Sequence, residues 1–159
     1  TNQSATTNTV WYFPFFVGAT TTFDRICALT GTVTTSGNIR LGIYNDSGGQ
    51  PSTVLLDAGQ AAFSASTTSY TITISQTLNP GWYWLAAVQQ SGSSTWLGIS
   101  TTSGSSGTGN QRMLNATTSP SFVTGFSQTN VTGAFATASG ITANSGSSAG
   151  GPMAYLRAL

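Results

Sequence analysis

The chain has 159 residues, of which 38% are hydrophobic and 11% aromatic, so it is long and apolar enough for one domain with a real core. Only 4% of the residues are charged, the formal net charge is +1, and histidine is absent. The lack of histidine excludes Ser-His-Asp and Cys-His catalysis and imidazole metal sites, and the near-neutral charge argues against a nucleic-acid partner.

The first residues and the single cysteine lead to three further expectations. No apolar run approaches the length of a membrane span, and the first residues lack the features of a signal peptide, so we expect no membrane insertion. Residues 1–10 are expected to form an N-terminal arm and residues 11–159 a single domain. Cys27 is expected to be a buried, inert thiol without a disulfide.

Short apolar runs separated by turn-forming residues predict strands in the first part of the chain. The first run, residues 11–17, is aromatic, and Pro14 predicts that it is an edge strand or contains a bulge. Residues 21–35 are predicted as one long strand, with core candidates Phe23, Ile26, Leu29 and Val33. A turn at 36–38 precedes an alternating strand at 39–44, in which one face carries Ile39, Leu41 and Ile43.

The second part of the chain continues the same pattern. A turn is predicted at 45–51, followed by short strands at 54–56 and 61–63. Residues 70–75 alternate between apolar and polar side chains, which predicts a half-buried strand. Residues 81–88 are apolar on both faces, as in a central strand packed between layers.

The remaining residues hold few elements. A short strand is predicted at 96–99, a Ser/Gly/Thr loop at 101–110, an irregular stretch at 138–151 and a last strand at 152–159. No segment sustains a helical period. The predicted fold class is therefore all-β: an antiparallel β-sandwich, jelly-roll-like, with long Ser/Gly loops.

The few carboxylates give little indication of catalysis or metal binding. Asp24, Asp46 and Asp57 are the only acidic residues, and the last two lie in turn sequences where aspartate commonly bonds to local backbone. The residues around Asp46 also lack the alternating acidic spacing of a calcium loop. We therefore predict that the chain is not an enzyme and has no cofactor and no metal site.

Aromatic side chains are the better candidates for binding. Trp82 and Trp84 share one face of the central strand and are predicted to be core residues. Trp96 follows a polar loop, so it is predicted to be partly exposed and to contact a ligand. The loops 89–96 and 101–112 add three further candidate ligand-binding or receptor-binding residues: Gln90, Asn110 and Arg112.

Several sequence blocks resemble a known domain family. They are FDRI at 23–26, LGIY at 41–44 with GGQP at 48–51, LLDAG at 55–59, ITISQTL at 72–78, PGWYWLA at 80–86 and the closing Leu156-Arg157. In this combination and spacing they resemble a β-sandwich domain of bacteriophage structural proteins, especially distal tail-fibre and minor tail proteins. The resemblance extends over residues 11–159, and it carries no agreed binding residues.

The resemblance implies a non-enzymatic virion structural protein on the particle surface. A tail-fibre or receptor-binding appendage for host attachment is expected first, and a capsid-attached fibre or decoration protein is the other location. Such appendages are often homotrimers, so a trimer is expected, with other virion proteins and a host surface glycan or protein as partners. The aromatic residues Trp11, Phe13 and Phe16 would form the subunit or docking interface. A carbohydrate-binding module of a secreted protein is the alternative.

Overall fold

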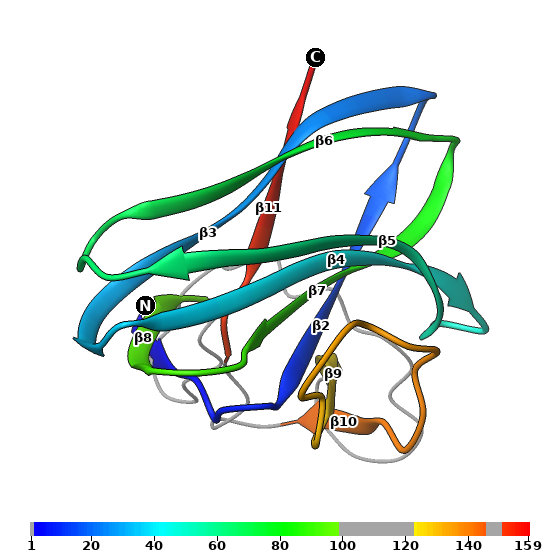
Figure 1. Cartoon of the computed structure of the whole chain (residues 1–159). Coiled ribbons are helices and arrows are strands. Elements are labelled where there is room, and N and C mark those ends of the chain that lie inside the picture. Colours follow the sequence, from blue (N-terminus) through cyan, green and yellow to red (C-terminus); the bar gives the residue numbers. More distant parts are fainter. Residues whose placement is uncertain (1, 99–122, 146–150) are drawn as a thin grey trace, which may run out of the picture.

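The computed structural model describes residues 2–98, 123–145 and 151–159. Its regular elements are all strands, and the described residues include no helix (Figure 1). The strands are β1 (Asn2–Ser4), β2 (Val10–Val17), β3 (Thr21–Thr35), β4 (Gly37–Ser47), β5 (Gln50–Phe63), β6 (Ser69–Leu78), β7 (Gly81–Gln89), β8 (Ser93–Leu97), β9 (Val123–Gln128), β10 (Thr142–Ser145) and β11 (Ala154–Ala158).

The strands form two antiparallel sheets packed together, which confirms the predicted all-β sandwich. One sheet has five strands in the order β1-β8-β3-β11, with β6 paired to the other side of β3. The second sheet has six strands in the order β10-β9-β2-β7-β4-β5. Figure 1 shows β3 and β6 above β4, β5 and β7, with β11 running from the top of the view down behind β5 and β4.

The inner core lies between the two sheets. The prediction that Ile39, Leu41 and Ile43 share an inward face is confirmed, since all three are fully buried. They pack with the inward side chains of the other strands, which include Ile26, Ala28, Phe63, Leu78, Leu85, Ala87 and Trp96. Each large aliphatic side chain removed from water in this way contributes about 1.5 to 3 kcal/mol.

A second core covers the outer face of the six-stranded sheet. The segment 129–141, called the covering segment below, lies over this face and packs there against side chains of β2, β4, β7 and β9 (Figure 1). The buried aromatic members of this outer core are Tyr12, Tyr44, Trp84, Phe126 and Phe135. The prediction that residues 81–88 form a central strand is thereby confirmed, because β7 has Leu85 in the inner core and Trp84 in the outer core.

The strand β2 is an edge strand over half of its length. It pairs with β9 only from Val10 to Tyr12, whereas its pairing with β7 continues to Val17. Pro14 lies in the half where β7 is the one neighbour among the described strands. A proline is tolerated on such an edge because its missing N–H can face the open side.

The expected short strands at 54–56 and 61–63 are one strand, β5. The predicted break between them, Asp57 to Gly59, is a register shift inside the pairing with β4, at Leu41 and Gly42. Gly59 has φ of +86°, a conformation that favours glycine, so the chain bulges here without leaving the sheet.

Smaller differences concern the predicted core and turns. Leu29 is only half-buried and lies outside both cores, because Ile26 and Ala28 set the inward face of β3. The turn at 36–38 is confined to Ser36, and the hairpin at 45–51 turns at Gly48 and Gly49, both with positive φ. Within the segment expected as an arm, residues 2–4 form β1, which pairs with β8.

Candidate functional site

All three carboxylates of the chain are engaged in contacts that hold the fold together. Asp24 accepts hydrogen bonds from Arg157, which holds its pKa below the usual value. Asp46 accepts from the indole Nε1 of Trp84 at 2.8 Å and from Gly49 N at 3.2 Å. Each carboxylate thus has an arginine or an indole, with or without backbone N–H groups, as its hydrogen-bond donor.

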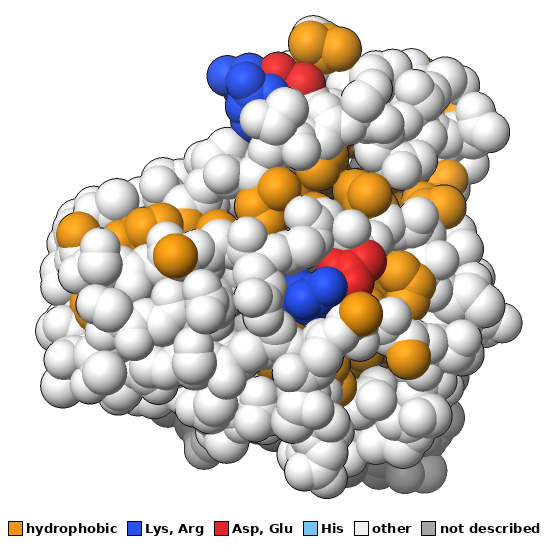
Figure 2. Space-filling view, viewed as in Figure 1, with side chains coloured by type: hydrophobic (Ala, Val, Ile, Leu, Met, Phe, Trp, Pro, Cys, Tyr) orange, Lys and Arg blue, Asp and Glu red, His pale blue; other side chains and the backbone are white. Residues whose placement is uncertain are grey.

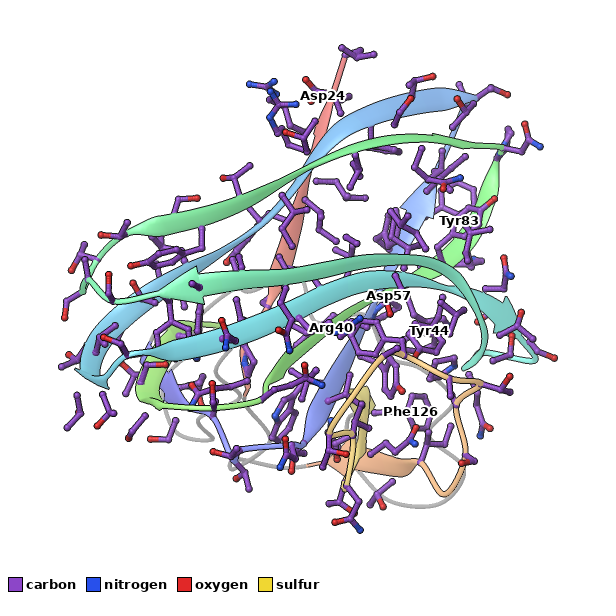
Figure 3. All side chains as sticks on the ribbon, in the orientation of Figure 1. Asp24, Arg40, Tyr44, Asp57, Tyr83 and Phe126 are labelled. Carbon is purple, nitrogen blue, oxygen red and sulfur yellow. The ribbon has the colours of Figure 1, made fainter. Side chains whose placement is uncertain are left out.

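Asp57 fastens the covering segment to the sheet. It accepts from Arg40 Nε at 2.9 Å, Gly59 N at 3.0 Å and Phe135 N at 3.0 Å. The Arg40 guanidinium also lies 6.0 Å from the centre of the Phe135 ring. Figure 3 shows Arg40, Asp57 and Tyr44 close together beside this segment. The arrangement is a structural latch.

A polar hollow of about 210 Å³ lies beneath the covering segment. It is lined by Tyr44, Gln128, residues 130–134 and Ala136, and its lining contains no charged side chain. The Tyr44 hydroxyl donates to Ala136 O at 2.9 Å, and burial raises the pKa of Tyr44. A phenol that stays protonated acts as a hydrogen-bond donor, and here its partner is the backbone of the covering segment.

Trp96 is a core residue, so the prediction that it is partly exposed is wrong. Its exposed fraction is 0%, its ring lies 5.1 Å from that of Phe63, and its Nε1 donates to Gln89 Oε1 at 2.8 Å. The signal that could have placed it is Gln89, which continues the inward alternation of Leu85 and Ala87. The polar residue after the apolar run is therefore the buried partner of an indole.

Of the other predicted ligand-binding residues, the structure describes Gln90. Gln90 is half-buried, and its side chain donates to Gly133 O at 2.7 Å and to Val131 O at 3.2 Å, so it holds the covering segment. Asn110 and Arg112 lie outside the described residues. Trp96 is thus buried and Gln90 is bonded to the covering segment, whereas a ligand contact at Asn110 or Arg112 stays a prediction.

The predicted docking residues separate into two groups. Phe13 is 3% exposed and therefore cannot form a docking surface, which corrects the prediction. Trp11 is half-buried, and its ring lies against the backbone of Gly151, where an added Cβ would approach it to 2.2 Å. The burial of Trp11 and Phe13 was not expected from the sequence, because the aromatic run alone does not show that odd-numbered residues of β2 face the interior. Phe16, in contrast, is 52% exposed.

Trp82 is on the surface, although it was predicted to be a core residue with Trp84. It is 39% exposed, and its ring lies 5.2 Å from that of Phe16. Trp82 does share a face with Trp84, but the covering segment reaches only Trp84. Phe16 and Trp82 together form what we call the aromatic pair.

An apolar groove of about 390 Å³ adjoins the aromatic pair at Phe16. Its walls come from the end of β2, the start of β3 and from β11, and its lining includes Phe15, Val17, Phe23, Leu85, Leu156 and Tyr155. The groove thus opens where β2 and β11 approach each other. The aromatic pair and the groove together are called the open end.

The exposed large apolar side chains lie on more than one face near the groove. Among the described residues, the large hydrophobic side chains that remain exposed are Phe16, Trp82, Tyr155 and Leu159. Phe16 and Tyr155 line the groove, Trp82 contacts Phe16, and Leu159 N donates to Thr22 O next to the groove residue Thr21. An apolar groove with an exposed aromatic pair beside it is a candidate interaction site.

Three further features of the described residues concern metal binding, membrane-spanning helices and the free cysteine. No group of three or more His, Cys, Asp or Glu side chains there could hold a metal ion. No helix there is long and apolar enough to cross a membrane. Cys27 is a half-buried free thiol.

Comparisons with protein-family models, with curated proteins and with solved structures found no match for this chain.

Proposed function

We propose that this chain is a non-catalytic structural module of a bacteriophage virion, displayed on the particle surface and joined to its partners through the open end. The observation that carries the proposal is the apolar groove formed by β2, β3 and β11, beside which Phe16 and Trp82 leave an exposed aromatic pair. The sequence blocks that resemble tail-fibre domains point to the same class of protein. The open end is the attachment surface in this proposal.

The rest of the surface supports a role in an assembly. Figure 2 shows that the visible face carries two small charged groups amid uncharged side chains. Figure 3, in the same orientation, places Asp24 at the upper group and the Arg40–Asp57 pair at the central one. Charge normally keeps a free monomer soluble. A surface covered by hydroxyl and amide groups suits a module held in a larger particle.

The proposal is tested by immunogold electron microscopy of particles made by the phage that encodes the chain, with antibody raised against the purified protein. Label on the tail or baseplate supports a receptor-binding appendage. Label over the head supports a head fibre or decoration protein. Particles that carry no label, while antibody recognises the protein in the same lysate, would overturn the virion proposal.

A carbohydrate-binding module is the second candidate, and the exposed ring of Trp82 favours it, since indole faces commonly stack on sugar rings. A glycan array separates the two candidates. The module predicts binding that Trp82→Ala abolishes, whereas Thr77→Ala, at an exposed residue of β6, leaves it unchanged. Binding by neither the native chain nor the control would remove this candidate.

A further inference from the structure

Among the described residues, β11 is an edge strand of the five-stranded sheet. Within the five-stranded sheet it pairs with β3, and no other described strand pairs with it. Its pairing with β3 is regular from Ala154 to Arg157, and the register shift that follows results from the extra residue Asp24 on β3. An open edge strand presents unpaired N–H and C=O groups to a further strand.

The hydrogen-bonding phase of β11 follows from the residue directly after the strand. Leu159 N donates to Thr22 O at 3.0 Å, on the β3 side. Backbone groups of successive residues in an antiparallel strand face opposite neighbours. The N–H and C=O groups of Ala154, Leu156 and Ala158 therefore face the open side.

The sequence of β11 is self-complementary about Leu156. The strand reads Ala-Tyr-Leu-Arg-Ala from 154 to 158. If a second copy paired antiparallel with it on a two-fold axis at Leu156, Leu156 would face its own copy and Ala154 would face Ala158. Tyr155 would then lie opposite Arg157 twice, once on each side of the axis.

The side-chain environment agrees with such a pairing. Tyr155 is 38% exposed and the Arg157 side chain 63% exposed, so both are accessible on the outer face of the sheet. A guanidinium beside a tyrosine ring is attractive, and aromatic or charge-complementary pairs across strands stabilise a sheet. On the inner face, Leu156 lines the apolar groove, which the second copy would cover.

We propose that two copies of this chain associate through antiparallel pairing of their β11 strands, with the two-fold axis at Leu156. The two five-stranded sheets then continue into each other, and the grooves on either side of the axis are closed by the partner. A two-fold contact uses the same patch on both copies, which is why a self-complementary strand favours a second copy over an unrelated partner. The inference rests on the proposed role of the open end as an attachment surface and names the occupant of its β11 side.

The contact is tested first by the mass of the purified protein, measured by sedimentation equilibrium from about 1 to 100 μM. We expect a species of twice the chain mass of 16.3 kDa. Tyr155→Arg places like charges opposite each other at both Tyr–Arg positions and should weaken association at least about tenfold. Tyr155→Phe keeps the ring and should associate like the native chain.

A disulfide test fixes the register of the pairing. Leu156→Cys in a Cys27→Ala background should form a covalent dimer under mild oxidation. Residues paired on the axis have Cα atoms about 5.5 Å apart, within the range of a disulfide. The matched control is Leu159→Cys in the same background, since the two copies of residue 159 would lie roughly 20 Å apart.

Three results would overturn the pairing: a monomer at all concentrations, a trimer, or equal crosslinking of the two cysteine variants. Circular dichroism of Tyr155→Arg shows whether loss of association reflects loss of fold. Failure of the pairing is distinct from failure of the virion proposal. If antibody labels particles but the chain is a monomer or a trimer, the virion proposal stands and the pairing fails. If the chain is a dimer but antibody labels no particle, only the pairing stands.

Discussion

At the scale of single residues, Asp57 has the largest predicted effect, because one carboxylate joins β4, β5 and the covering segment. Asp57→Asn should lower the free energy of unfolding by about 1.5 to 3 kcal/mol near neutral pH, the usual size for a hydrogen-bonded charged group. Urea denaturation followed by tryptophan fluorescence measures it. The matched control is Arg25→Gln, whose side chain makes a looser pair with Asp24 at 3.5 Å and where we expect a smaller change. Equal effects of the two variants would contradict the latch.

The same residue predicts an acid dependence. Burial raises the pKa of Asp57, but the hydrogen bonds from Arg40, Phe135 and Gly59 lower it by more, so the pKa lies below its usual value. A carboxyl with a depressed pKa in the fold stabilises the protein above the unfolded pKa of about 4, and this contribution is lost as the pH falls through the folded pKa. The native chain and Asp57→Asn should therefore converge in stability in acid. A difference in unfolding free energy between the two proteins that stays constant from pH 7 downward would contradict this acid dependence.

Tyr12 predicts the opposite, alkaline dependence. It is 1% exposed, donates to Gln128 Oε1 at 3.0 Å, and burial raises its pKa to about 12. Its contribution to stability is complete below the unfolded pKa of 10 and is lost as the pH rises toward the folded value, by about 1.4 kcal/mol per pH unit. Denaturant midpoints across this range measure the loss. Tyr12→Phe should cost about 1 kcal/mol at neutral pH and show a smaller alkaline loss.

At the scale of elements, the bulge in β5 gives a sharp comparison. Gly59 has φ of +86°, whereas Gly18 has no positive φ, and an added Cβ meets nothing within 4 Å at either position. Gly59→Ala should therefore cost about 1 to 2 kcal/mol from backbone strain alone, and Gly18→Ala should be close to neutral. Thermal denaturation of the two variants measures the difference. Equal melting temperatures would mean that the bulge relaxes.

Alternation in the sequence predicts which face a side chain takes, but not what covers that face. It placed Ile39, Leu41 and Ile43 in the inner core, and it placed Trp82 and Trp84 on one shared face. It could not separate Trp84 from Trp82, because their difference depends on how far the distant covering segment reaches. The prediction of two short strands in place of β5 has a similar reason. A bulge and a turn use the same residues, Asp57 to Gly59, and only the pairing with β4 distinguishes them.

At the scale of the whole molecule, composition predicted a neutral surface, but the position of the open end depends on tertiary structure. The groove is built from β2, β3 and β11, which are far apart in the sequence and meet only through sheet pairing. Local patterns carry no information about such a meeting. The aromatic run at 11–17 drew attention to the correct strand, yet of its three predicted docking residues Phe16 alone lies at the open end.

The sparse charge of the molecule predicts that salt has little effect on its stability. Of the described ion pairs, Arg40–Asp57 is mostly buried, while Asp24 pairs with Arg25 and Arg157 nearer the surface. Surface pairs are screened by salt and contribute little, and a net charge of +1 leaves almost no repulsion to relieve. Urea denaturation at about 0.05 and 0.5 M sodium chloride should give free energies of unfolding within about 1 kcal/mol of each other. Sodium sulfate is the matched comparison, because it strengthens apolar burial and should raise stability. A large response to sodium chloride would mean that charge interactions outweigh apolar packing in this fold.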